Sequence, residues 1–128
     1  MNPHNTPLEG TKLSNFTPLP HVPALQVIDL QEGSGAAVQP GTTITAHYTG
    51  ALAADGTIFQ SSHDFGDPAT FGLKQVIAGW TEGVPGMKVG GIRRLLIPAS
   101  KAYGVQSPAP NIPPNADLVF DIELVAIK

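Results

Sequence analysis

The sequence predicts a two-layer α+β fold, in which one short helix packs against one face of an antiparallel sheet. Two segments, Thr42–Gly50 and Asp117–Lys128, alternate apolar and polar residues. This period of two is typical of strands that bury one face of an antiparallel sheet and expose the other. One segment has apolar residues at helical spacing instead, namely Val76, Ile77, Trp80, Val84 and Met87. We therefore expect several strands and a single helix.

The segment at the start of the chain, residues 1–22, is expected to be a poorly ordered arm, followed by a domain over residues 23–128. The arm is polar and shows no periodic pattern, which is typical of loose chain ends. It contains four prolines: Pro3, Pro7, Pro18 and Pro20. Leu13 and Phe16 are its candidates for contact with the domain.

From about residue 24 onward, strand-like runs alternate with turn signals. Six runs are expected to be strands: Leu25–Leu30, Thr42–Gly50, Thr57–Ser61, Thr70–Leu73, Gly91–Ile97 and Asp117–Lys128. In the second run, Ile44, Ala46 and Tyr48 share the apolar face. Asp55 and Gly56 form a turn signal between the second and third runs.

The helical segment must be short and stabilised by packing. Gly79 and Gly83 each cost about 1 kcal/mol relative to alanine inside a helix. Pro85 disfavours continuation of the helix, because proline lacks the backbone N–H and clashes with the preceding turn. The apolar stripe therefore covers only about two turns.

The composition of the chain excludes several classes of protein. Its 128 residues correspond to one domain, with 13% charged residues and a net charge of −3. Seven basic residues against ten acidic ones do not favour nucleic acid as a partner. The sequence has no apolar run long enough for a membrane span and no signal-peptide pattern at its start. The absence of cysteine excludes disulfides and, with the other features, favours the cytoplasm.

Side chains that could carry covalent or metal chemistry are few. The chain has four histidines: His4, His21, His47 and His63. They lack metal-ligand spacing, and His47 lies on the polar face of its strand, where a structural role is favoured over a catalytic one. Arg93 and Arg94 form one basic pair, expected on or near the wet face of their strand. We therefore expect no metal ion and no cofactor.

A set of aromatic and branched apolar residues is spread over several predicted elements. Its members are Tyr48, Phe59, Val76, Ile77, Trp80, Tyr103, Ile112 and Phe120. For any one of them, membership of the core is the simpler interpretation. Trp80 and the two tyrosines indicate a pocket more strongly than the others, because a buried indole N–H or phenol needs a hydrogen-bond partner and often lines a pocket.

The order of short motifs along the chain is more specific than any single one. The motifs are His47-Tyr48-Thr49-Gly50, Gln75-Val76-Ile77-Ala78-Gly79-Trp80, Ala102-Tyr103-Gly104, Ile112-Pro113-Pro114-Asn115 and Leu118-Val119-Phe120-Asp121. In this order they resemble the FKBP-type peptidyl-prolyl cis-trans isomerases. The resemblance covers about residues 25–128 and leaves the first 22 residues outside.

The resemblance implies a five- to six-stranded antiparallel sheet wrapped around one short helix, with a pocket between them. It implies that Trp80 forms the pocket floor, that the Ile77 N–H donates to a ligand carbonyl, and that the Tyr103 hydroxyl reaches a second carbonyl. Residues 105–114 would form a flap over the site. The residues expected to act in catalysis are Tyr48, Phe59, Trp80, Tyr103 and Phe120. Those expected to bind substrate are Gln60, Val76, Ile77 and Ile112.

Three positions depart from the pattern of that family. Gln60 stands where an aspartate is usual, and the basic partner often found near Phe65 is missing as well, so no lone buried charge remains. Ala69 stands where an aromatic wall residue is common, and the stretch between Phe71 and Gln75 is about two residues short. Phe65 is our candidate for refilling that wall.

These features together predict an isomerase acting on Xaa-Pro bonds in peptides and partly folded proteins. Rapamycin- and tacrolimus-type macrolides are expected as inhibitors, and a monomer without nucleic-acid or membrane partners is expected. The alternative is a non-catalytic adaptor or chaperone module with the same pocket, which Gln60 and Ala69 favour.

Overall fold

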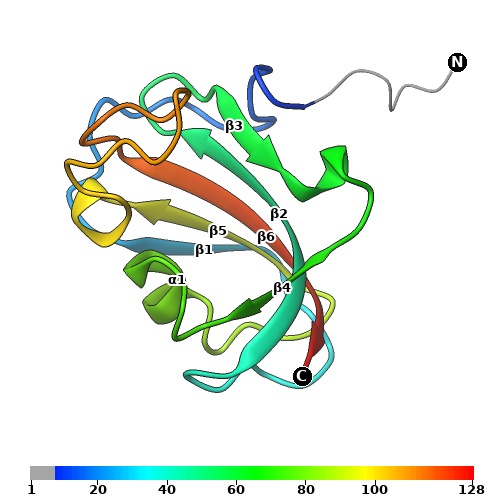
Figure 1. Ribbon diagram of the computed structural model, residues 1–128. Helices are drawn as coiled ribbons and strands as arrows, with labels where there is room; N and C mark the ends of the chain where they lie inside the picture. The colour runs from blue at the N-terminus through cyan, green and yellow to red at the C-terminus, as the bar shows by residue number, and fades with distance from the viewer. Residues whose placement is uncertain (1–7) are drawn as a thin grey trace, which may run out of the picture.

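The computed structural model describes residues 8–128, and Figure 1 shows their arrangement. The six strands are β1 (Gln26–Gln31), β2 (Thr43–Leu52), β3 (Ile58–Ser61), β4 (Ala69–Gly72), β5 (Ile92–Ile97) and β6 (Leu118–Ile127). The helices are α1 (Ala78–Gly83) and the short 3₁₀ turns η2 (Ser62–Asp64) and η3 (Ala99–Lys101). Each of the six strands overlaps one of the six runs predicted from the sequence.

The strands form one antiparallel sheet in the order β1-β5-β6-β2-β3, and β4 also pairs with β2. β2 and β6 are the longest strands, and Figure 1 shows them curving past α1. The pairing of β2 with β6 shifts register between Thr45 and Ala46, and such bulges bend and twist a strand. The predicted α+β fold, a six-stranded antiparallel sheet around one short helix, is confirmed.

The two glycines of α1 allow the helix to lie directly on β5. A Cβ atom on Gly79 would lie 2.6 Å from side-chain atoms of Ile97, and one on Gly83 would lie 2.8 Å from Leu95. Any other residue at these positions would push the helix away from the sheet. The glycines that weaken α1 as an isolated helix therefore permit the packing that stabilises it in the protein.

A buried arginine, Arg93, forms hydrogen bonds at the C-terminal end of α1. The Arg93 Nη1 atom donates to the carbonyl oxygens of Gly83 at 2.9 Å and of Pro85 at 3.2 Å. The same guanidinium pairs with Asp29 at 2.7 Å. The last carbonyls of a helix have no partner inside the helix. Arg93 therefore satisfies the C-terminal end of α1 and is buried, as is Arg94, rather than facing solvent as expected.

The second face of the sheet is covered by residues 8–22, which we call the strap. Leu96 and Val119 alternate along their strands with residues of the main core, so they point to the opposite face. There they join a second apolar cluster with Val22, and the partly buried Leu13, Phe16 and Leu19 of the strap pack against it.

The strap is also held by polar contacts. The Arg94 guanidinium donates to the carbonyl oxygens of Asn15 at 2.7 Å and Ser14 at 3.1 Å, and it lies 5.5 Å from the centre of the Phe16 ring. The backbone N–H of Val22 donates to Asp117 at 2.7 Å. The loose arm expected over residues 1–22 is thus packed against the sheet over residues 8–22, and residues 1–7 lie outside the described residues. Within residues 8–128, no helix is long and apolar enough to cross a membrane.

Candidate active site

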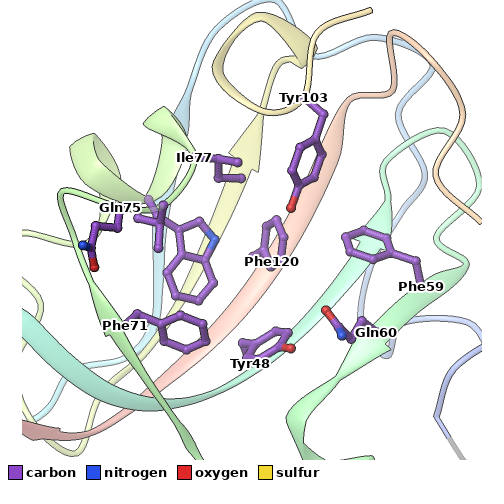
Figure 2. Close-up of a pocket in the computed structure, with 10 residues that line it drawn as sticks. Tyr48, Phe59, Gln60, Phe71, Gln75, Ile77, Tyr103 and Phe120 are labelled. Carbon is purple, nitrogen blue, oxygen red and sulfur yellow. The ribbon is translucent and has the colours of Figure 1, made fainter. Parts of the chain in front are cut away.

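A pocket of about 360 Å³ opens between α1 and the inner face of the sheet. Ten residues line it: Tyr48, Phe59, Gln60, Phe71, Gln75, Val76, Ile77, Trp80, Tyr103 and Phe120. They come from β2, β3, β4, β6, α1 with the residues before it, and the segment after η3. None of the ten has a side chain that is charged at neutral pH, and six of them are aromatic. Figure 2 shows these side chains around the pocket.

The aromatic rings of the pocket meet at edge-on or tilted angles. The Trp80 ring centre lies 4.9 Å from that of Phe71 and 5.4 Å from that of Phe120. Tyr48 meets Trp80 edge-on at 6.0 Å, and Phe59 meets Phe120 edge-on at 5.6 Å. These arrangements are the favourable ones for aromatic pairs, because they place positive ring edges against negative faces. The rings therefore brace one another and fix the shape of the pocket.

Two hydroxyl groups and one backbone N–H supply hydrogen bonding at the walls. Figure 2 shows the hydroxyl of Tyr103 pointing into the space between Ile77 and Phe59. Burial raises the pKa of the Tyr103 phenol and the pKa of the Tyr48 phenol, so both stay protonated at neutral pH and can donate. Within residues 8–128, no hydrogen-bond acceptor is found for the Ile77 N–H, which leaves this donor open to a ligand.

Most of the residues predicted from the sequence meet at this pocket. The five expected catalytic residues and three of the expected substrate-binding residues line it, namely Tyr48, Phe59, Trp80, Tyr103, Phe120, Gln60, Val76 and Ile77. The ninth, Ile112, is 6% exposed and belongs to the main core, not to the pocket lining. It anchors the flap, residues 105–114, on the domain.

The prediction for the missing aromatic wall residue was wrong. The side chain of Phe65 is 71% exposed and does not line the pocket. Phe71 fills the wall instead, in edge-on contact with Tyr48 at 5.5 Å. Ala69 and Phe71 both lie on β4, and residues two apart on a strand share a face. That spacing is the sequence signal that identifies Phe71. Gln75 was also missed, because an isolated amide before the helix carries no pattern.

His47 and His63 do not line the pocket. The rings of His47 and His63 stack with centres 4.1 Å apart and planes 14° apart. The Ser62 hydroxyl lies 2.9 Å from His47 Nδ1 and accepts from the backbone N–H of Tyr48 at 2.8 Å. Among the described residues, no group of three or more potential ligands could hold a metal ion.

A six-stranded antiparallel sheet wrapped around one short helix, with an uncharged aromatic pocket between them, defines the structural class of this chain. The family profile for the FKBP-type peptidyl-prolyl cis-trans isomerases matches residues 35–125. The chain belongs to this family.

Relatives and solved structures agree with this family. The chain is 52% identical over 91 residues to the peptidyl-prolyl cis-trans isomerase FPR2 of Saccharomyces cerevisiae, covering 70% of this chain and 67% of that protein. It is 47% identical over 106 residues to an FK506-binding protein of Neisseria meningitidis, covering 81% of this chain and 96% of that protein. The crystal structure of FkpA from Escherichia coli superposes with a TM-score of 0.73 at 42% identity, covering 81% of this chain and 48% of FkpA.

Proposed function

We propose that the chain accelerates the cis–trans isomerisation of Xaa-Pro bonds in peptides and partly folded proteins. The observation that carries this proposal is the uncharged aromatic pocket of about 360 Å³, with open hydrogen-bond donors at its wall. Such a pocket accepts a proline ring and leaves the adjacent amide within reach of the donors. The relatives are named as isomerases, which supports catalysis over a non-catalytic adaptor.

An uncharged pocket can lower the barrier to this reaction without transferring a proton to a side chain. Rotation about the peptide bond must break amide resonance, at a barrier of about 18–20 kcal/mol. Resonance places negative charge on oxygen, so the planar amide has a larger dipole than the twisted one and is better solvated by water. Removing water therefore raises the planar ground state relative to the twisted state. Each 1.4 kcal/mol of such differential stabilisation gives about a tenfold acceleration.

The pocket residues have two roles in this proposal, namely binding the proline ring and orienting the substrate backbone. Trp80 and Phe120 contact the proline ring, and Tyr48 and Phe59 close the pocket around it. The Ile77 N–H donates to a substrate carbonyl oxygen and fixes the position of the backbone. The Tyr103 hydroxyl donates to a second carbonyl oxygen and fixes its orientation. None of the ten lining residues carries a charge, so the dry environment of the pocket is not offset by an ion there.

The same pocket is proposed to bind rapamycin- and tacrolimus-type macrolides, which would compete with the substrate. Two features support this: relatives are named FK506-binding proteins, and the ring-binding wall is completed by Phe71. Gln60 offers an amide donor and acceptor at the pocket edge, which can replace a carboxylate as a hydrogen-bonding group. Because one chain supplies every lining residue, the proposed catalytic unit is a monomer. The cytoplasmic location stays a prediction from the sequence.

Exchange spectroscopy on a proline tetrapeptide tests this function. We expect catalytic amounts of the protein to accelerate exchange between the cis and trans forms, and a tacrolimus-type macrolide to abolish the acceleration. Macrolide binding without any acceleration would instead establish the adaptor function. Acceleration that a saturating macrolide leaves unchanged would place catalysis outside this pocket.

A further inference from the structure

One side chain of the flap is hydrogen-bonded to the strand that carries a pocket wall. The side-chain amide of Asn111 donates to the backbone carbonyl oxygen of Phe59 at 2.9 Å. The ring of Phe59 lines the pocket and meets Phe120 edge-on. This bond therefore joins the flap to the pocket wall across 52 residues of sequence.

The flap itself is braced internally. The Ser107 hydroxyl lies within hydrogen-bonding distance of the carbonyl oxygens of Ile112, at 2.7 Å, and Ala109, at 3.0 Å. The backbone N–H of Ile112 also donates to Ala109 at 3.0 Å. Prolines within the flap fix further backbone angles. A segment braced in this way moves as a unit, so its placement depends on how it is attached to the sheet.

The strap holds the same region from the outside. The backbone N–H groups of Leu8 and Glu9 donate to the Asp64 carboxylate at 2.8 Å and 3.1 Å. Next to them, the Gly10 N–H donates to the Ile58 carbonyl oxygen at 2.8 Å, so the strap is fixed at the start of β3 and at the η2 turn that follows β3. This places a carboxylate oxygen of Glu9 3.5 Å from the Asn111 side-chain nitrogen.

The two N–H groups of the Asn111 amide are thus directed toward two acceptors. The amide nitrogen lies 2.9 Å from the Phe59 carbonyl oxygen and 3.5 Å from a Glu9 carboxylate oxygen, and both acceptors favour the rotamer in which this nitrogen points at β3. The contact with Glu9 is long for a hydrogen bond, so the Phe59 carbonyl oxygen is the main partner of Asn111 and Glu9 adds a weaker electrostatic preference.

We propose that Asn111 is a positioning residue for the isomerase pocket and that Glu9 of the strap orients it. This inference rests on the proposed function, because it assigns a role in substrate binding at the same site. Asn111 holds the flap against β3 before substrate arrives, so the substrate does not have to order the flap on binding.

Kinetic and relaxation measurements on the full chain test this inference. We expect Asn111→Ala to raise the KM for a proline peptide by about fivefold, because the loss of one hydrogen bond has an effect of this size. The value of kcat should change by less than about twofold. Asn111→Asp should raise KM at least as much at neutral pH, because its carboxylate has no proton to donate. Glu9→Ala should raise KM by a smaller factor. Gln106→Ala removes another exposed flap amide and should leave KM unchanged.

Backbone ¹⁵N relaxation of the substrate-free protein provides a readout that does not depend on activity. We expect lower order parameters for residues 105–114 in Asn111→Ala than in wild type, with the sheet unchanged. An Asn111→Ala protein that is folded, with wild-type KM and wild-type flap order, would overturn the inference. If wild type itself shows no isomerase activity but the flap loosens in the variant, the proposed function fails while the flap contact stands.

Discussion

The guanidinium of Arg93 donates to the carbonyl oxygen of Gly83 at 2.9 Å and so joins β5 to the end of α1. The helix has six residues and no side-chain hydrogen bond at its N-cap, so its ends contribute little stability of their own. Trp80 lies on this helix, so an interaction that fixes the helix also fixes the indole in the pocket.

We therefore expect Arg93→Met to destabilise the protein by about 2 kcal/mol, because buried carbonyls of α1 lose a charged donor. Urea unfolding measures this free energy. Lys101→Met is the matched control, since Lys101 also ties a segment to α1 through Glu82 at 2.9 Å but is substantially exposed. It should cost less than about 1 kcal/mol. Equal effects of the two variants would refute the role assigned to Arg93.

Phe71 lines the pocket and Phe65 does not, so we expect substitution of these two residues to affect activity differently. Phe71→Ala should lower kcat/KM for a short proline peptide by about tenfold, because the ring contacts both Trp80 and Tyr48. Phe65→Ala should leave it unchanged, since the Phe65 ring is exposed. A peptidyl-prolyl isomerase assay on both variants checks this pair, and a larger loss with Phe65→Ala would show that the wall is assigned wrongly.

The Tyr103 hydroxyl is expected to orient the substrate and not to transfer a proton. Tyr103→Phe should lower kcat/KM by about threefold to tenfold, the effect of one lost hydrogen bond. Because burial raises the pKa of Tyr103 and of Tyr48, activity should be flat between about pH 6 and 9. A pH–rate profile tests this, and a fall in activity with an apparent pKa in that range would contradict a purely orienting hydroxyl.

The stacked histidines predict a dependence of stability on pH. Partial burial, and to a smaller extent the His47 ring, lowers the pKa of His63 in the folded protein. The unfolded chain therefore takes up this proton more readily, so the stability present above about pH 6.5 is lost as the pH falls through the lower folded-state pKa. The melting temperature should fall between pH 7.5 and 5.5, and His63→Asn should reduce that fall. An identical fall in the variant would exclude His63 as its cause.

The strands and the helix could be predicted from the sequence because their patterns are local. The alternation in β2 and β6 follows from burial of one face, and the stripe through Trp80 follows from helical spacing. The role of Gly79 and Gly83 could not be predicted, because a penalty to the helix becomes an advantage only once β5 lies against it.

Other features depend on contacts between distant segments. The sequence predicts a loose arm where the strap lies, because the few apolar residues of this segment follow no periodic pattern. The strap is held by Arg94, which is 80 residues away from Ser14 in the sequence, so no local pattern indicates this contact. The burial of Arg93 could not be predicted either, because it depends on the hydrogen bond that Arg93 donates to the carbonyl oxygen of Gly83 at the end of α1. The pocket aromatics were identified through a family resemblance, since composition alone marks each of them only as a core residue. Phe71 was missed although its position two residues after Ala69 indicates the same face.

The central claim is that the dry aromatic pocket around Trp80 holds the proline ring during isomerisation. Intermolecular nuclear Overhauser effects with a ¹³C-labelled Xaa-Pro peptide under exchange conditions test this most directly. We predict contacts from the proline ring protons to the indole of Trp80 and to Phe120, in a sample where the protein accelerates cis–trans exchange. Accelerated exchange with the proline ring in contact only with residues outside this pocket would contradict the account.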